Sequence, residues 1–106
     1  MESVVLDVIK ECSVPYGRYN IDGPCSGECF RETKLIPYLD KYENIIIDIS
    51  GTQLGYPSSW LEECFGGLIR NKYMNKAEFI RRVSFIGNNS WVDEILEYVD
   101  CASKTN

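Results

Sequence analysis

Three consecutive isoleucines, Ile45 to Ile47, constrain the fold more than any other feature of the chain. They lie within the segment 44–49, whose unbroken apolar run is typical of a strand buried on both faces. Such strands occupy the middle of largely parallel sheets, in which each connection crosses over through a helix. The sequence therefore predicts a sheet with helices packed on it. No apolar run is long enough to span a bilayer, so we expect no membrane partner.

The other patterned segments alternate between strand and helix. Alternating β-branched residues predict strands at 3–9 and 82–86, and a short extended piece is expected at Arg18 to Ile21. Apolar residues at helical spacing predict helices after Ser26, from Ser59, at 76–81 and from about 89 onward. This order predicts an α/β fold, with a mixed sheet of about four strands and three to four helices packed on it.

We expect the chain to form a single domain over residues 1–106, with its core at about 3–101 and a frayed C-terminal tail. Ser26 and Ser59 are predicted helix caps, and Ser59 with Glu62 fits a capping box. Pro37 should end or kink its helix near Leu35. Two adjacent glycines, 66 and 67, in mid-helix indicate that another backbone packs closely there.

The charge of the chain narrows the classes of partner. The formal net charge is −5 and the pI about 4.7, which argues against binding to nucleic-acid phosphates. The one basic cluster is interpreted as a solvated face and consists of Lys72, Lys76, Arg81 and Arg82. The N-terminus lacks the basic start and apolar core of a signal peptide, so we expect a cytoplasmic protein.

The chain has five cysteines and no histidine. The odd cysteine number and the missing secretion signal predict no disulfide framework. Cys25 and Cys29 are four residues apart, which does not fit the tight pairs of structural zinc sites. We therefore expect no metal and no cofactor, with Cys29 and Cys64 as small core residues and Cys25 in a loop.

Three stretches, at 17–39, 45–70 and more loosely 83–99, carry specific motifs. The first contains a Gly-Arg pair and a turn-rich run into Glu-x-Phe-Arg-Glu, and the second contains Ser-Ser-Trp-Leu-Glu-Glu and Phe-Gly-Gly-Leu. Together they cover about residues 16–100 and resemble the STAS-like domain family of unknown function, a bacterial and phage-associated group. The resemblance implies a four- or five-stranded sheet with helices and a regulatory, protein-binding role.

The STAS pattern also implies particular site residues. In that pattern a strand ends in Asp, and a serine at the following helix start is phosphorylated by a partner kinase. Asp48 matches the aspartate, and Ser58 and Ser59 match the two serines. Pro57 stands where the pattern has an acidic residue, and Trp60 replaces a glycine.

The residues themselves allow two interpretations of the serine pair. A helix N-terminus favours phosphate through its free N–H groups and dipole, so phosphorylation at Ser58 or Ser59 could switch the surface. The alternative is that Ser59 is only an N-cap. Tyr56 and Trp60 flank the pair as candidate interface anchors, and the alternative for them is core filling.

The loop and helix start from Gly17 to Arg31 form a second candidate site. Glycines, a proline and several polar groups could present N–H groups and an arginine to an anion, and the polar set is Arg18, Asp22, Ser26, Glu28 and Arg31. The alternative is structural, with Arg18 or Arg31 pairing with Asp22, Asp48 or Glu28 to pin the loop onto the sheet. Carboxylates such as Glu62 lack a histidine or nucleophile partner, so we do not expect an enzyme.

We therefore predict a non-catalytic regulatory module that binds a protein, either kinase-like or another regulator. One alternative is a small anion- or nucleotide-binding sensor or enzyme that uses the Gly17–Arg31 loop. Another is a phage or mobile-element inhibitor whose acidic surface binds a host protein.

Overall fold

The computed structural model describes residues 3–52 and 55–105. Its helices and strands follow one another along the chain as β1 (Ser3–Asp7), α1 (Val8–Glu11), η1 (Asn20–Asp22), α2 (Gly27–Phe30), η2 (Arg31–Leu35), α3 (Ile36–Lys41), β2 (Asn44–Asp48), α4 (Ser58–Leu61), η3 (Glu62–Gly66), α5 (Gly67–Arg70), α6 (Lys76–Arg82), β3 (Val83–Ile86) and α7 (Asn89–Thr105). Helices α2, η2 and α3 are continuous, as are α4, η3 and α5, and each has a π-helical middle.

The described residues form one parallel sheet of three strands in the order β1-β2-β3. The isoleucine run lies in the central strand, as predicted. The expected count of four strands and the mixed sheet are wrong. The segment Arg18 to Ile21 is not extended, because the Asp22 carboxylate accepts hydrogen bonds from the N–H groups of Arg18 and Tyr19 and closes the turn η1.

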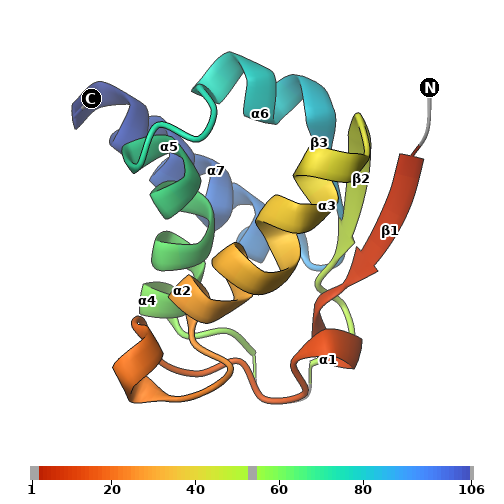
Figure 1. Cartoon of the computed structure of the whole chain (residues 1–106), viewed down its shortest axis with the longest axis vertical. Coiled ribbons are helices and arrows are strands. Elements are labelled where there is room, and N and C mark those ends of the chain that lie inside the picture. Colours follow the sequence, from red (N-terminus) through yellow and green to blue (C-terminus); the bar gives the residue numbers. More distant parts are fainter. Residues whose placement is uncertain (1–2, 53–54, 106) are drawn as a thin grey trace.

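In the part of the chain that the structure describes, helices cover one face of the sheet and leave the other uncovered (Figure 1). Leu6 and Ile47 are in register on the covered face and fully buried. On the other face, Val5 is exposed and its neighbour Ile46 is half-buried, so the expected burial on both faces is wrong. The strand order explains this, because successive right-handed crossovers in one direction place their helices on the same face.

The core lies between the sheet and the helices and is rich in aromatic rings. Trp60, Phe65 and Phe79 are fully buried, with ring centroids 6.4 Å apart between Trp60 and Phe65 and again between Phe65 and Phe79. Helix α7 packs along η3 and α5 and closes this layer. Within the described residues, no helix is long and apolar enough to cross a membrane.

Local signals predicted some helix ends and missed others. Ser26 caps α2 as predicted, because its Oγ accepts a hydrogen bond from the N–H of Cys29 at 3.0 Å. The predicted cap at Ser59 is wrong, since α4 begins at Ser58 after Pro57 and its start has no side-chain cap. The helix also continues past Pro37, which falls in the first turn after the π-helical segment ends at Leu35.

Candidate functional site

The two predicted site segments, the Gly17–Arg31 loop and the start of α4, lie side by side. The indole Nε1 of Trp60 donates a hydrogen bond to the carbonyl oxygen of Cys25 at 2.7 Å. Gly27 permits the contact between the helices, because a Cβ atom there would lie 2.6 Å from the carbonyl oxygen of Trp60. The loop is therefore fixed against α4 at its C-terminal end.

A buried ion pair joins α2–η2–α3 to α4–η3–α5. Arg31 is 3% exposed and Glu63 is 6% exposed. The Arg31 Nη1 atom lies 2.8 Å from Glu63 Oε2 and also donates to the Glu63 carbonyl oxygen, and its Nε bonds to Glu32. Burial lowers the pKa of Arg31, but the hydrogen bonds to Glu63 and Glu32 outweigh it and raise the pKa above its ordinary value.

Two further arginines complete the cluster at its partly exposed side. Arg18 Nη1 donates to Glu62 Oε1 at 2.5 Å, and Arg70 Nη1 donates to Glu62 Oε2 at 2.5 Å. Both arginines also reach Glu63 Oε1 at 3.3 Å. Burial raises the pKa of Glu62, but hydrogen bonds from Arg70 and Arg18 outweigh burial and hold its pKa below the usual range.

The glycine pair makes room for this cluster. A Cβ atom on Gly67 would lie 2.2 Å from Arg31 Nη1, and one on Gly66 would lie 2.9 Å from Glu62 Oε2. Both glycines are closely approached, but the nearest atoms belong to the side chains of Glu62 and Arg31, so the predicted close approach of another backbone is wrong. Arg31 and Glu63 each lie in a π-helical segment, a geometry that recurs at functional sites.

The polar groups of the Gly17–Arg31 loop are largely engaged within the protein. Ser26 caps α2, Asp22 binds two backbone N–H groups, and Glu28 Oε1 accepts a hydrogen bond from the N–H of Asn20 at 2.8 Å. With Arg18 and Arg31 both held by glutamates, the loop is pinned in place. This agrees with the structural interpretation of the loop, in which ion pairs of its arginines hold it in place.

The particular pairings expected for that alternative are wrong. The arginines pair with Glu62, Glu63 and Glu32 and not with the residues expected from sequence, and the loop is pinned to a helix rather than to the sheet. Asp48 instead bonds to the N–H and hydroxyl of Ser50, and these hydrogen bonds lower its pKa.

The serine pair and the aromatic residues beside it differ in exposure to solvent. Ser58 is exposed at the first residue of α4, and Ser59 is half-buried. Trp60 is fully buried and Tyr56 nearly so, with its hydroxyl donating to the carbonyl oxygen of Ile49 at 3.0 Å. The interpretation of Tyr56 and Trp60 as interface anchors is therefore wrong, since both fill the core. Burial also raises the pKa of Tyr56.

A group of exposed apolar side chains projects from the segment 14–21, which overlaps the predicted Gly17–Arg31 site. It consists of Val14, Tyr16, Tyr19 and Ile21. Tyr19 and Ile21 lie within the predicted Gly17–Arg31 site, and Val14 and Tyr16 precede it. They place an apolar surface beside the charged cluster.

The cysteine pairing also differs from the prediction. Cys12 and Cys25 form a disulfide with their Cα atoms 5.7 Å apart, which ties the end of α1 to the start of α2. Cys29, Cys64 and Cys101 are free, and Cys64 is a core residue as predicted. Within residues 3–52 and 55–105, no group of three or more side chains is placed to hold a metal ion.

Fold and site together define a small α/β module with one covered sheet face and a fixed, partly apolar loop beside a helix start. The family model of the STAS-like domain of unknown function matches residues 26–93, and the chain belongs to this family. Neither a curated protein sequence nor a solved structure matches the chain. STAS-like domains are regulatory modules of the anti-sigma-factor antagonist superfamily and generally bind proteins.

Proposed function

We propose that this chain is a non-catalytic regulatory module that binds a protein partner, kinase-like or another regulator, through one surface. This docking surface comprises the Gly17–Arg31 loop, the exposed side chains of segment 14–21 and the helix start at Ser58 and Ser59. The observation that carries the proposal is the group of four exposed apolar side chains on a loop fixed by ion pairs, a hydrogen bond and a disulfide. Exposed apolar groups on a fixed frame mark interaction sites.

We further propose that phosphorylation of Ser58 or Ser59 switches this surface. Ser58 is exposed, so a kinase can reach it. Ser59 and Arg18 line the same surface hollow. A phosphate on Ser59 adds about two negative charges close to Arg18, which is paired with Glu62 in this structure. Phosphoserine forms strong hydrogen bonds with arginine, so it competes with Glu62 for this side chain. Competition for Arg18 would loosen the loop from α4 and change the shape that the partner meets.

The test is a capture experiment from lysate of the source cell with three immobilised proteins. They are the wild-type domain, the Ser58→Glu/Ser59→Glu variant, and a Ser90→Glu control at the exposed start of α7. The proposal predicts a protein that the wild type and the control capture and the double variant releases, with all three folded by circular dichroism. Equal capture by all three removes the switch, and capture by none removes the binding module. The identity of a captured protein also separates a host target of an acidic inhibitor from a regulatory kinase.

A further inference from the structure

The disulfide between Cys12 and Cys25 encloses the group of exposed apolar side chains, because segment 14–21 lies between the two cysteines. The two cysteines differ in their access to solvent. Cys12 is 4% exposed, whereas Cys25 is half-buried and lines an open hollow of about 260 Å³ together with Val14 and Tyr16. A thiol in solution therefore reaches this bond from the Cys25 side.

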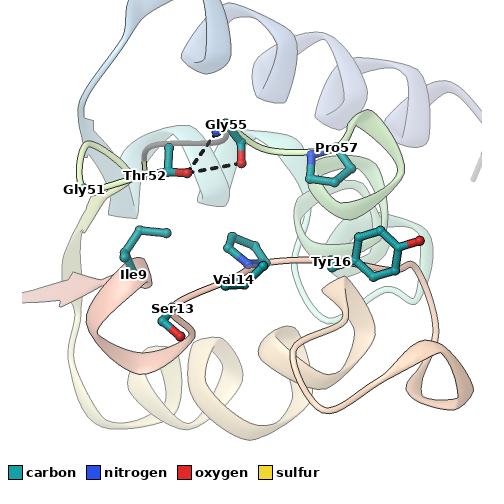
Figure 2. Close-up of a pocket in the computed structure, with 9 residues that line it drawn as sticks. Ile9, Ser13, Val14, Tyr16, Gly51, Thr52, Gly55 and Pro57 are labelled. Atoms are coloured by element: carbon teal, nitrogen blue, oxygen red, sulfur yellow. Dashed lines mark hydrogen bonds between the residues drawn. The ribbon is translucent and has the colours of Figure 1, made fainter.

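Val14 is restrained through its neighbours rather than by contacts of its own backbone. It is exposed, and within the part of the chain that the structure describes it makes no hydrogen bond. On one side Cys12 is fixed by the disulfide. On the other side Pro15 is buried, and the N–H of Tyr16 donates to the carbonyl oxygen of Cys25 at 3.2 Å. Figure 2 shows Val14 and Tyr16 on one side of a surface groove.

The turn that follows this segment is held without help from the disulfide. The carbonyl oxygen of Gly17 accepts a hydrogen bond from the N–H of Gly27 at 2.9 Å, and that of Arg18 accepts one from the N–H of Glu28 at 3.0 Å. Loss of the S–S bond therefore releases the chain before Val14 and leaves the turn after it in place.

The same site also accommodates the reduced form. Cys12 Sγ lies 3.6 Å from the carbonyl oxygen of Cys25, so a thiol at Cys12 has an acceptor although it is buried. The hydrogen bond from the indole N–H of Trp60 keeps that carbonyl in place. A thiol is a weak donor, so reduction replaces a covalent restraint by a weak contact. The site can therefore change its redox state without unfolding, and the segment gains freedom to move.

We propose that Cys12 and Cys25 form a reversible thiol–disulfide exchange site, whose co-reactant is a dithiol and whose redox state controls the docking surface. The disulfide keeps Val14 ordered for the partner, and reduction releases it. The control of binding rests on the proposed function, whereas the exchange chemistry does not.

Reduction transfers two electrons and two protons from the dithiol to the protein. A thiolate of the dithiol attacks Cys25 Sγ, the S–S bond breaks, and Cys12 leaves as a thiolate that takes up a proton. The second thiolate of the reductant then attacks the reductant's own sulfur in the mixed disulfide. This step forms the disulfide of the reductant and releases Cys25 as a thiolate, which also takes up a proton.

The first experiment equilibrates the folded full chain in mixtures of reduced and oxidised dithiothreitol without denaturant. Acid quenching, alkylation and mass spectrometry should find Cys12 and Cys25 either both free or both blocked, and oxidised reagent should restore the disulfide. The control is Cys101→Ser, which removes an exposed cysteine of α7 and should leave the exchange unchanged. A pair that stays free in oxidised reagent, or that exchanges only in urea, would overturn the proposal.

The second experiment measures backbone ¹⁵N order parameters of the oxidised and the reduced chain. Reduction should lower the value for Val14 to below about 0.6, the range of flexible backbone, and leave the value for Arg18 unchanged. An equal value for Val14 in both forms would show that the bond does not order this segment, and it would overturn the proposal.

The third experiment uses the protein that the wild type captures from lysate. The disulfide form should bind it about tenfold more tightly than the reduced form, because the reduced form must order Val14 and its neighbour on binding. Cys12→Ser, shown to be folded, should bind as the reduced wild type does. Equal affinity of the two redox forms would overturn the control of binding. If lysate capture yields no partner, the proposed function fails, and the first two experiments still decide the exchange site.

Discussion

Replacing Arg31 with methionine tests whether the buried ion pair holds the two long helices together. The change removes the charge that faces Glu63 and leaves that carboxylate 6% exposed, with Arg18 and Arg70 still 3.3 Å away. Breaking a buried pair from one side costs about 3–5 kcal/mol in the free energy of unfolding. We expect the lower end, about 3 kcal/mol, because the two remaining arginines partly compensate Glu63.

Urea unfolding followed by circular dichroism measures this loss. With an m value of about 1.5 kcal/mol/M, a loss of about 3 kcal/mol lowers the midpoint by about 2 M. The control is Arg81→Met, whose ion pair with Glu43 lies at the surface and contributes about 0.5 kcal/mol or less. A double variant with Glu63→Leu should be less destabilised than the sum of the single changes, because no charge is left buried. An Arg31→Met midpoint within about 0.5 M of wild type would refute the reasoning.

Three further predictions follow from the same contacts. The pKa of Glu62 is lowered in the folded state, so its contribution to stability is complete above the unfolded value of 4.5 and is lost as pH falls through the folded pKa. The urea midpoint of Glu62→Gln should therefore change less with pH across this range than the midpoint of wild type. Burial raises the pKa of Cys64, so iodoacetamide at pH 8 should label the exposed Cys101 first and Cys64 only after unfolding, as mass spectrometry of the labelled peptides would show. Gly67→Ala should destabilise the domain despite better helix propensity, because the new Cβ displaces Arg31; a thermal midpoint equal to or above wild type would contradict this.

The fold was predictable where local pattern decides it. The run Ile45 to Ile47 identified the central strand, and Ser26 identified a helix start because its Oγ accepts a hydrogen bond from the N–H of Cys29. The uncovered sheet face was not predictable, because an isoleucine run does not reveal strand order, and strand order decides where the crossovers lie. Ile46 therefore faces outward in a segment that looks uniformly buried.

The candidate site was predictable in its segments but not in its contacts. Arg31 and Glu63 are 32 residues apart, so only the packing of two helices brings them together. The π-helical segments shift the side chains that follow them, and neither segment has a signature in the sequence. Trp60 resembled an exposed anchor beside two serines, yet its indole lies in the core, where its N–H group donates to the carbonyl oxygen of Cys25 in the loop. The disulfide likewise depends on a tertiary contact between α1 and the loop.

The most direct test of the account is a hydrogen–deuterium exchange footprint of the purified domain, free and bound to the captured partner. The account predicts slower exchange in the complex across residues 13–28 and 55–63, where the docking surface lies. Exchange across α6 should stay unchanged. Protection confined to β1, β2 and β3, at the uncovered sheet face around Val5 and Ile46, would contradict it and place the partner on the opposite side of the sheet.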